Sequence, residues 1–271
     1  MARLSQALEM VGQTDPGLVR AQNEDAIVWD ADAGLVVLAD GMGGYNAGEV
    51  ASAIAVEVMA RRLAQPLPSS PLSQSTRLSV SGWVERAIDE ANRVIYDTAL
   101  AQPQCAGMGT TLVAGLFYDN RALVAHVGDS RMYRLRNAEL TRLTRDHSLL
   151  QEQIDLGLVD ADAPDRAVQR NLLTRAVGID TEVQPDIGEF DTLPGDLYLL
   201  CSDGLTDMVD DVQIADILLT LKDNPSLAAM QLVQTANQRG GHDNISVILV
   251  AVRRPYPADA GFWSRLTAWL S

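Results

Sequence analysis

The stretch Leu35-Val36-Val37-Leu38-Ala39-Asp40-Gly41-Met42-Gly43-Gly44 places a run of strand-forming residues directly before an aspartate and a glycine-rich turn. A strand buried on both faces accommodates a carboxylate only at its end. Asp129 and Asp203 also follow such runs, and Asp243 stands just before one. Carboxylates gathered at strand ends repel one another unless cations neutralise them, and hard oxygen ligands suit Mg²⁺ or Mn²⁺. The pattern therefore predicts a multi-metal site, of the kind that serves phosphate chemistry.

The bulk composition is that of a globular protein. The chain has 271 residues, of which 47% are apolar, enough for one large domain or two. No apolar run approaches the roughly 18 to 20 residues that span a bilayer, and the first residues lack the apolar stretch of a signal peptide. Two cysteines make a disulfide framework improbable. We expect a cytoplasmic protein without stable membrane insertion.

The net charge bears on the class of partner. A formal charge of −15 argues against a nucleic-acid partner, because such proteins present a basic face to the phosphate backbone. Part of the acidic excess comes from the predicted metal ligands, whose charge bound cations would offset.

Strand-forming runs are spread along most of the chain. They cover residues 25–30, 34–39, 109–118, 121–127, 131–136, 196–201 and 245–252. The sequence Asp119-Asn120-Arg121 between two of these runs is typical of a hairpin turn. Residues 30–34 are interpreted as another hairpin turn.

Helical spacing of apolar residues predicts four helices. Two long ones lie around 50–59 and 84–98, with a breaker-rich loop at 66–71 between them, and two more cover 211–222 and 226–238. Strands in runs, with helices in pairs, favour an α+β fold with packed sheets over an alternating parallel sheet. Since no stretch is typical of a linker, we expect one domain over 1–254 and a C-terminal tail over 255–271.

Each polar motif has a simple structural alternative when it is taken alone. The segment 40–44 could be a tight strand-to-helix turn. Asp203 could cap a helix, and the segment 240–244 could be a turn before the last strand. Their joint occurrence in a fixed order is what these alternatives do not explain. The motifs, in order, are Arg20…Asn23-Glu24-Asp25, Asp40-Gly41-Met42-Gly43-Gly44, Gly109-Thr110-Thr111, Gly128-Asp129-Ser130-Arg131, Ser202-Asp203-Gly204 and Asp243-Asn244.

This ordered set, over roughly residues 8 to 254, resembles the metal-dependent protein phosphatases of the PP2C (PPM) family, and Gly-Met-Gly-Gly resembles its bacterial branch. The resemblance implies a four-layer α-β-β-α sandwich, in which two antiparallel sheets pack face to face between helix pairs. It also implies that residues 145–177 form a flap beside the active site. Within that flap we expect short helices at 151–156 and 170–175.

The resemblance further implies a set of metal ligands. Asp40 would bridge two metal ions, Asp203 and Asp243 would complete the protein ligands of the first, and the carbonyl of Gly41 would bind the second. The cofactors would be two or three Mn²⁺ or Mg²⁺ ions.

Further roles follow from the same resemblance. Asp25 and Glu24 would hold waters around the second metal, and Asp129 would bind a third, weaker metal together with Asp203. Arg20 would hold the substrate phosphate, because a guanidinium fork matches phosphate oxygens. Asn244 would orient the site.

The implied activity is hydrolysis of phosphoserine and phosphothreonine in proteins. A hydroxide bridging two Mg or Mn ions would attack phosphorus directly, without a covalent phosphoenzyme. The substrates would be phosphorylated proteins, targets of a serine/threonine kinase, and the enzyme would be a monomer. Met42 stands where eukaryotic relatives carry a proposed histidine acid, and Tyr45 where many bacterial relatives carry histidine. His126, His147 and His242 are interpreted as structural.

Other classes of phosphatase and hydrolase match the sequence less well than the PP2C family does. Residues 30–34 mimic the Asp-x-Asp motif of haloacid-dehalogenase phosphatases but have Gly34 where that motif needs Thr or Val. The sequence has no Cys-x₅-Arg cradle and no P-loop. A pseudophosphatase, which would use the same fold only for binding or sensing, would be expected to lack a metal carboxylate. The tail could touch a membrane or a partner, but packing on its own domain is the simpler expectation.

Overall fold

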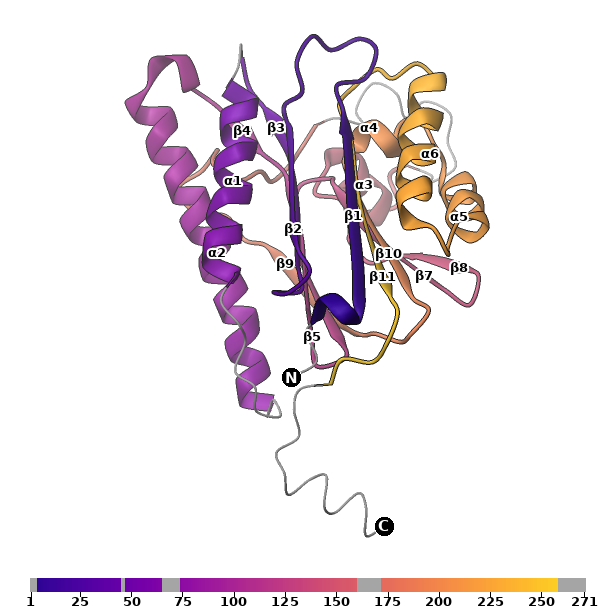
Figure 1. The fold of residues 1–271 in the computed structure, drawn as a ribbon. Helices are drawn as coiled ribbons and strands as arrows, with labels where there is room; N and C mark the ends of the chain where they lie inside the picture. The colour runs from indigo at the N-terminus through magenta and orange to yellow at the C-terminus, as the bar shows by residue number, and fades with distance from the viewer. Residues whose placement is uncertain (1–3, 45–46, 65–73, 160–171, 258–271) are drawn as a thin grey trace.

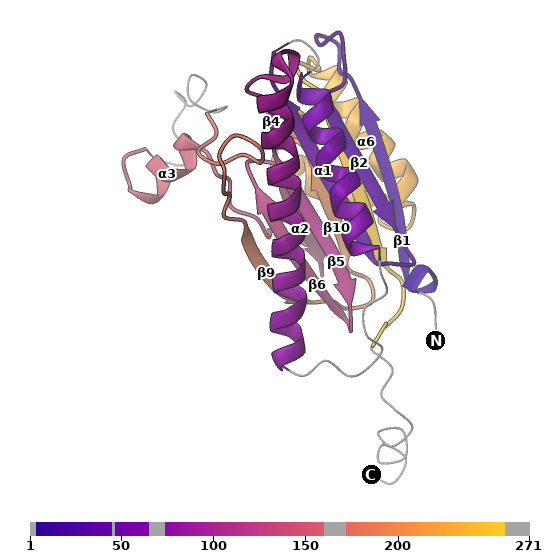
Figure 2. The same cartoon turned by 90° about the vertical axis from the view of Figure 1, so that its left-hand side faces the viewer.

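Two β-sheets lie face to face between two pairs of helices, as Figure 1 shows. The structure is a computed structural model, and its described residues are 4–44, 47–64, 74–159 and 172–257, with only the backbone described for 74–79. The quarter turn in Figure 2 shows α1 and α2 side by side over one sheet. This architecture confirms the expected α-β-β-α sandwich.

The first sheet has five strands, all antiparallel to their neighbours. Its order is β1 (Leu8–Asp15), β11 (Ile245–Val252), β10 (Leu197–Cys201), β7 (Arg131–Arg136) and β8 (Glu139–Arg142). Strands from both termini of the chain therefore pair in this sheet, which closes the domain.

The second sheet is also antiparallel. Its order is β2 (Asp25–Asp30), β3 (Leu35–Met42), β5 (Leu112–Tyr118), β6 (Arg121–Val127) and β9 (Asp186–Asp191), with the short β4 (Gly109–Thr110) paired to the end of β3.

Two helix pairs cover the outer faces of the sheets (Figure 1). The pair α1 (Ala47–Leu63) and α2 (Gln74–Ala101) covers the second sheet, and the pair α5 (Asp211–Thr220) and α6 (Pro225–Gln238) covers the first. The shorter elements are η1 (Leu4–Gln6), η2 (Pro103–Cys105), α3 (Leu149–Asp155) and α4 (Asp203–Thr206). None of the helices in the described ranges combines the length and the apolar character needed to cross a bilayer.

The core has three apolar layers, which follow from the two-residue period of the strands. In β3, Val37 points toward α1 and α2, whereas Val36 and Leu38 point toward the other sheet. Across the gap between the sheets, the rings of Phe117 and Tyr198 meet edge to face with centroids 5.2 Å apart. Because both faces of the central strands are buried, these strands are nearly continuous apolar runs in the sequence.

Most predicted elements are confirmed within a few residues of their bounds. The hairpin at Asp119 and Asn120 is present, and both residues have positive φ, 46° and 55°, as a two-residue hairpin turn requires. The loop predicted at 66–71 lies outside the described residues, as does the tail from residue 258 onward.

Three predictions need correction. The run 109–118 is split at Thr111, whose backbone and side chain both bond to Asp40. The helix expected at 170–175 is wrong in its described part, because Leu173 forms a β-bridge with Ser148. The strands β1, β8 and β9 were not predicted; each is an edge strand with partly exposed side chains, so none has a long apolar run.

Candidate active site

Two carboxylates from the second sheet stand directly opposite each other. Asp40 lies near the end of β3, and its register partner across the ladder is Asp25 at the start of β2. Their Cα atoms are therefore at neighbouring positions of adjacent strands, where like charges destabilise the sheet. The sequence predicted both residues for the site, and the register brings them together.

Two further carboxylates come from the first sheet, where β10 and β11 are adjacent. Asp203 follows β10 and opens α4, and Asp243 precedes β11. A Cβ atom at Gly204 would lie 2.0 Å from the carbonyl oxygen of Asn244, so only glycine allows these two segments to approach this closely. Ser202 joins the sheets, because its Oγ donates to Asp25 Oδ2 at 2.8 Å.

Substitution of Gly204 should therefore disturb the fold and the site together. We expect Gly204→Ala to lower the free energy of unfolding by roughly 1–3 kcal/mol, the usual cost of forcing an extra carbon into a packed position. Gly82→Ala is the matched control, since its Cβ would meet only the flexible end of Arg86 at 3.4 Å within α2. Chemical denaturation should show the control at least as stable as the wild type. Equal stability of the two variants would contradict the close approach.

Proximity and lost hydration raise the pKa values of the carboxylates. Asp25 is buried, and Asp40, Asp129 and Asp203 are partly buried. Burial raises the pKa of Asp25 to about 6, although hydrogen bonds with serines act to lower it. For Asp129, burial is the larger cause and the charge of Asp146 the second, and its pKa is raised to about 7. The pKa values of Asp40 and Asp203 are raised well above the usual range by burial and then by Asp25 and Asp129, respectively.

These carboxylates fit divalent cations. The buried oxygens Asp25 Oδ1 and Asp203 Oδ1 have no hydrogen-bond partner in the described structure. Native proteins rarely leave buried oxygens in this state, and a cation would supply both a partner and the missing charge. The donor set consists of hard oxygens, which suits Mg²⁺ or Mn²⁺.

The loop before β2 is held against the site by Asn244. Its Oδ1 accepts from the N–H of Glu24 at 2.8 Å, and its Nδ2 donates to the carbonyls of Pro16 and Gln22 at 3.0 and 2.9 Å. This loop carries Arg20, whose Nη2 lies 2.7 Å from Asp243 Oδ2. Asn244 therefore ties the loop that carries Arg20 to the start of β11.

Other predicted residues lie at the same end of the sandwich. The carbonyl of Glu24 accepts from the N–H of Gly41 at 3.1 Å, which ties the predicted water-holding residue to the predicted carbonyl ligand. Burial, before all charge effects, raises the pKa of Glu24. Asp129 lies in the turn between β6 and β7, close enough for its charge to be the leading electrostatic influence on Asp203. The structure thus brings the predicted site residues together.

Sequence analysis did not assign a role to Ser202, and it expected Thr111 to pack and hydrogen-bond in the strand below the site without naming its partners. Ser202 bridges Asp25 and β11, because its Oγ also accepts from the N–H of Ser246 at 3.0 Å. Thr111 Oγ1 accepts from the N–H of Asp40 at 3.1 Å and lies 2.7 Å from Ser130 Oγ. A serine or threonine at a strand end has many possible hydrogen-bond partners. The only sequence signal for such a role is that the residue lies within or next to a motif that contains an aspartate or glycine.

A second group of possible metal ligands lies beside the flap. One ligand atom each from His126, His147 and Asp186 fall within 4.8 Å of one another. However, the guanidinium Nη1 of Arg175 lies 2.9 Å from Asp186 Oδ1 and 3.3 Å from His147 Nε2, so a cationic group is already present there. The two imidazole rings are stacked, with centroids 4.8 Å apart, and their in-plane lone pairs therefore do not converge. The geometry of these three residues therefore suits a divalent metal ion less well than the oxygen donors of the aspartates do.

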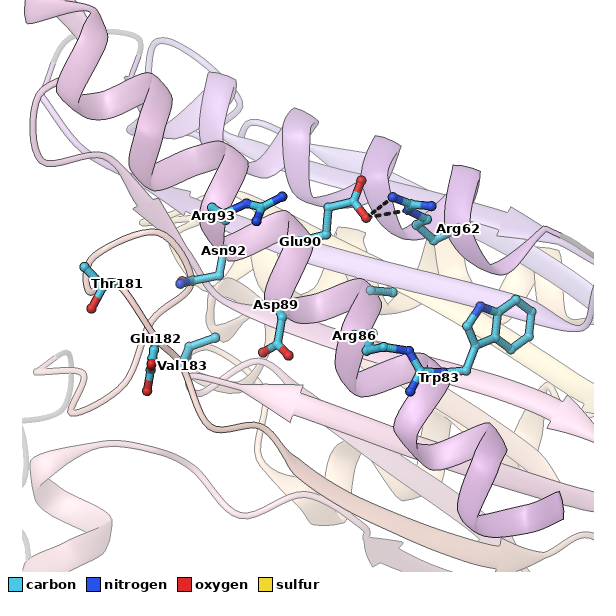
Figure 3. Close-up of a pocket in the computed structure, with 11 residues that line it drawn as sticks. Arg62, Trp83, Arg86, Asp89, Glu90, Asn92, Arg93, Thr181, Glu182 and Val183 are labelled. Atoms are coloured by element: carbon cyan, nitrogen blue, oxygen red, sulfur yellow. Dashed lines mark hydrogen bonds and ion pairs between the residues drawn. The ribbon is translucent and has the colours of Figure 1, made fainter. Parts of the chain in front are cut away.

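Figure 3 shows a separate surface groove of about 640 Å³ along α2. Its lining includes Trp83, Arg86 and Glu182, together with an ion pair between Arg62 and Glu90. None of the predicted site residues lines it. Its charges are of both signs and partly paired, as is usual for a solvated surface.

Comparisons with known proteins identify the family of this chain. Residues 19–244 match the family model described as protein phosphatase 2C. The serine/threonine protein phosphatase PstP of Mycobacterium tuberculosis is 39% identical over 254 residues, which are 93% of this chain and 46% of the relative. The serine/threonine phosphatase stp of Listeria welshimeri is 38% identical over 241 residues, covering 88% of this chain and 93% of the relative.

A solved structure of the PstP catalytic domain with two manganese ions superposes with a TM-score of 0.78 at 36% identity, covering 92% of this chain and 99% of that one. The chain therefore shares the fold of this manganese-bound phosphatase domain. The chain belongs to the protein phosphatase 2C family, which contains serine/threonine protein phosphatases of bacteria. It spans about half the length of the mycobacterial relative and nearly all of the Listeria one.

Proposed function

We propose that this domain removes phosphate from phosphoserine and phosphothreonine in proteins, with Asp40, Asp203, Asp243 and the carbonyl of Gly41 holding two Mn²⁺ or Mg²⁺ ions. The observation that carries the proposal is the convergence of carboxylates with raised pKa values and two unpartnered buried oxygens at one end of the sandwich. Bound divalent cations supply a water acidic enough to be hydroxide near neutral pH and positive charge for the phosphoryl oxygens.

The protein's own residues prepare this site. Three hydrogen bonds hold the backbone of Asp40: its carbonyl accepts from Thr110 Oγ1 and from the N–H of Thr111, both at 2.8 Å, and its N–H donates to Thr111 Oγ1 at 3.1 Å. Ser202 fixes one oxygen of Asp25 and leaves the other free for a cation or its water. A rigid set of charges requires little reorganisation when the transition state forms, and this preorganisation is a major source of catalysis.

Among the side chains that the structure describes at the site, none is an evident proton donor for the leaving serine or threonine oxygen. Met42, at the position where eukaryotic relatives carry histidine, cannot donate a proton. We assign that role to solvent at the site. The carboxylates Asp25 and Asp129, with pKa values of about 6 and 7 in the absence of metal, would be ionised once cations are bound. Asp129 would then be a ligand, and Asp25 would act through water.

The direct test compares substrates and metal conditions. Purified protein should hydrolyse phosphothreonine and phosphoserine peptides with Mn²⁺ or Mg²⁺ and should lose this activity in excess chelator. Restoration of activity by added Mn²⁺ would show that the chelator had not denatured the protein. A pseudophosphatase would bind Mn²⁺ in calorimetry but release no phosphate, and that result would refute the proposal.

Arg20 is proposed to hold the substrate phosphate. In this structure its Nη2 donates to Asp243, and its side chain is 54% exposed, which leaves other N–H donors free to reach a phosphate. The bond to Asp243 is the leading cause that raises the pKa of Arg20, so the guanidinium stays charged.

Arg20→Ala should therefore act on substrate binding more than on metal binding. Loss of a charge-assisted hydrogen bond should raise KM for a phosphopeptide roughly 10- to 100-fold. Arg20→Lys keeps the charge but not the fork, so its KM should lie between those of the wild type and the alanine variant. Steady-state kinetics at saturating Mn²⁺ measure this effect, and unchanged kinetics in the alanine variant would remove Arg20 from the site.

The substrates are proposed to be phosphoproteins that a serine/threonine kinase has modified. This proposal rests on the similarity to relatives named as serine/threonine protein phosphatases. The flap at about 145–177 would border the substrate, and of this segment residues 160–171 lie outside the described part of the structure. We also propose that the catalytic unit is the segment 1–254.

A further inference from the structure

The turn that carries Asp129 is hydrogen-bonded to a neighbouring loop, residues 146–149. The backbone N–H of His147 donates to the carbonyl of Gly128 at 2.9 Å. In return, the N–H of Gly128 donates to His147 Nδ1 at 3.2 Å. Backbone and side chain of one histidine thus hold both polar groups of the residue immediately before Asp129.

The other side of the same turn is held by the residue before His147. Arg131 Nε lies 3.0 and 3.2 Å from the two oxygens of Asp146, and its Nη2 lies 2.7 Å from one of them. This pair is mostly buried, with side-chain exposures of 24% and 9%. Asp129 and Ser130 therefore lie between two residues that are fixed from outside the turn. His147 hydrogen-bonds to Gly128, and Asp146 forms an ion pair with Arg131.

The conformation and close packing of Gly128 keep it in contact with His147. Its φ is +102°, and a Cβ there would lie 2.8 Å from the side chain of Thr111, so the residue fits only as glycine. Thr111 in turn bonds to Asp40 and Ser130. The turn is thus packed between the threonine that supports Asp40 and the ring of His147.

His147 also meets the far end of the flap. Its carbonyl accepts from the N–H of Thr174 at 2.9 Å, and the N–H of Leu149 donates to the carbonyl of Leu172 at 2.9 Å. A β-bridge between Ser148 and Leu173 completes this short pairing. The same loop therefore contacts residues 172–174 on one side and the Asp129 turn on the other.

The orientation of the His147 ring is determined by its surroundings. Burial, and then the charges of His126 and Arg175, lower the pKa of His147 to about 4, so the ring is neutral at neutral pH. Since Nδ1 accepts from Gly128, the proton of the neutral ring is on Nε2, which lies 3.4 Å from Asp186 Oδ2 and 3.3 Å from Arg175 Nη1. Stacking on His126 holds the ring plane.

We propose that His147 is a positioning residue for the weakest metal of the site. The Nδ1 atom of His147 holds Gly128, and Gly128 in turn keeps the Asp129 carboxylate in place for that metal. The pairing with residues 172–174 holds His147 itself. This inference rests on the proposed function, because it takes Asp129 as a metal ligand. It differs from a metal site at His126, His147 and Asp186, in which Nε2 rather than Nδ1 would be the important atom.

Two substitutions at His147 separate the roles of its ring nitrogens. Asparagine places an oxygen where Nδ1 stands, so His147→Asn keeps the acceptor for Gly128. Glutamine reaches the position of Nε2 and lacks the Nδ1 acceptor. Loss of one neutral hydrogen bond should weaken the low-affinity Mn²⁺ step roughly 2- to 10-fold in His147→Gln. The same step in His147→Asn should stay close to that of the wild type.

The experiment measures Mn²⁺ binding by titration calorimetry and by electron paramagnetic resonance of free Mn²⁺, without substrate. Asp129→Asn provides the reference for loss of the weak step, and Asp186→Asn is the control that removes the partner of Nε2. Tight Mn²⁺ binding and the melting temperature should be nearly unchanged in His147→Gln, which would show that the site still folds. In the double variant of Asp129→Asn and His147→Gln, the two effects should not add.

Each outcome decides between the alternatives. If Asp129→Asn weakens Mn²⁺ binding but His147→Gln does not, the inference is wrong and the proposed function stands. If Asp129→Asn has no effect, the assignment of a metal to Asp129 in the proposed function fails first. Equal losses in His147→Asn and Asp186→Asn would instead indicate a metal bound by the histidines and Asp186, which would also overturn the inference.

Discussion

Replacement of Asp203 with alanine is expected to abolish phosphoester hydrolysis. Asp203 is partly buried, its Oδ1 has no partner in the described structure, and its pKa is raised by burial and by Asp129, so a bound cation is the natural partner of this carboxylate. A metal ion contributes several kcal/mol of transition-state stabilisation, so its loss should lower kcat about 1000-fold or more. Hydrolysis of an aryl phosphate at saturating Mn²⁺ measures the effect.

Asp216→Ala is the matched control, because Asp216 is an exposed aspartate in α5 and lies outside the site residues. Its activity should equal that of the wild type. Residual activity of Asp203→Ala within a few fold of the control would refute the assignment. Acid quenching during turnover gives a second check, since a trapped phosphoenzyme would contradict direct attack by water.

The stability of the metal-free protein is expected to fall as the pH rises from about 4 to about 7. The pKa of Asp25 is raised from 3.8 to about 6, and that of Asp129 from 3.8 to about 7. The folded chain therefore holds these protons more tightly than the unfolded chain, and the stability they contribute at low pH is lost as each group ionises. Each unit of pKa shift corresponds to about 1.4 kcal/mol, so the combined loss should be on the order of several kcal/mol.

Urea denaturation of chelator-treated protein at pH 5, 6, 7 and 8 measures this loss. Saturating Mn²⁺ should restore stability at the higher pH values, because the cations bind the ionised carboxylates of the folded state alone. Asp129→Asn should flatten the pH dependence of the metal-free protein. A metal-free protein whose stability is the same at pH 5 and pH 8 would contradict the raised pKa values.

The central strands could be predicted because both of their faces are buried. The run at 35–39 and the run at 245–252 are almost continuously apolar, and the strands β3 and β11 begin within a residue of the predictions. The edge strand β9 could not be predicted, since its side chains are half solvated and its sequence, Asp-Ile-Gly-Glu-Phe-Asp, has only a weak period. Pairing with β6 alone makes it a strand.

The helix expected at 170–175 shows a similar limit. A short helix was expected there as part of the flap, but the backbone groups of Leu172 and Thr174 bond to the loop 147–149 instead. These backbone groups form their hydrogen bonds with a segment that is distant in sequence. The local sequence of residues 170–175 contains no information about that segment.

The sequence by itself determined which carboxylates stand at or near the ends of the buried strands. Asp40 and Asp203 end apolar runs, and Asp243 precedes one, because charge is excluded from the interior of a buried strand. Only the tertiary structure decided which groups hold those carboxylates. Ser202 and Asp25 are 177 positions apart and meet because the two sheets pack face to face. His147 reaches Gly128 in the same way, because hydrogen bonds depend on distances in space that sequence spacing does not encode.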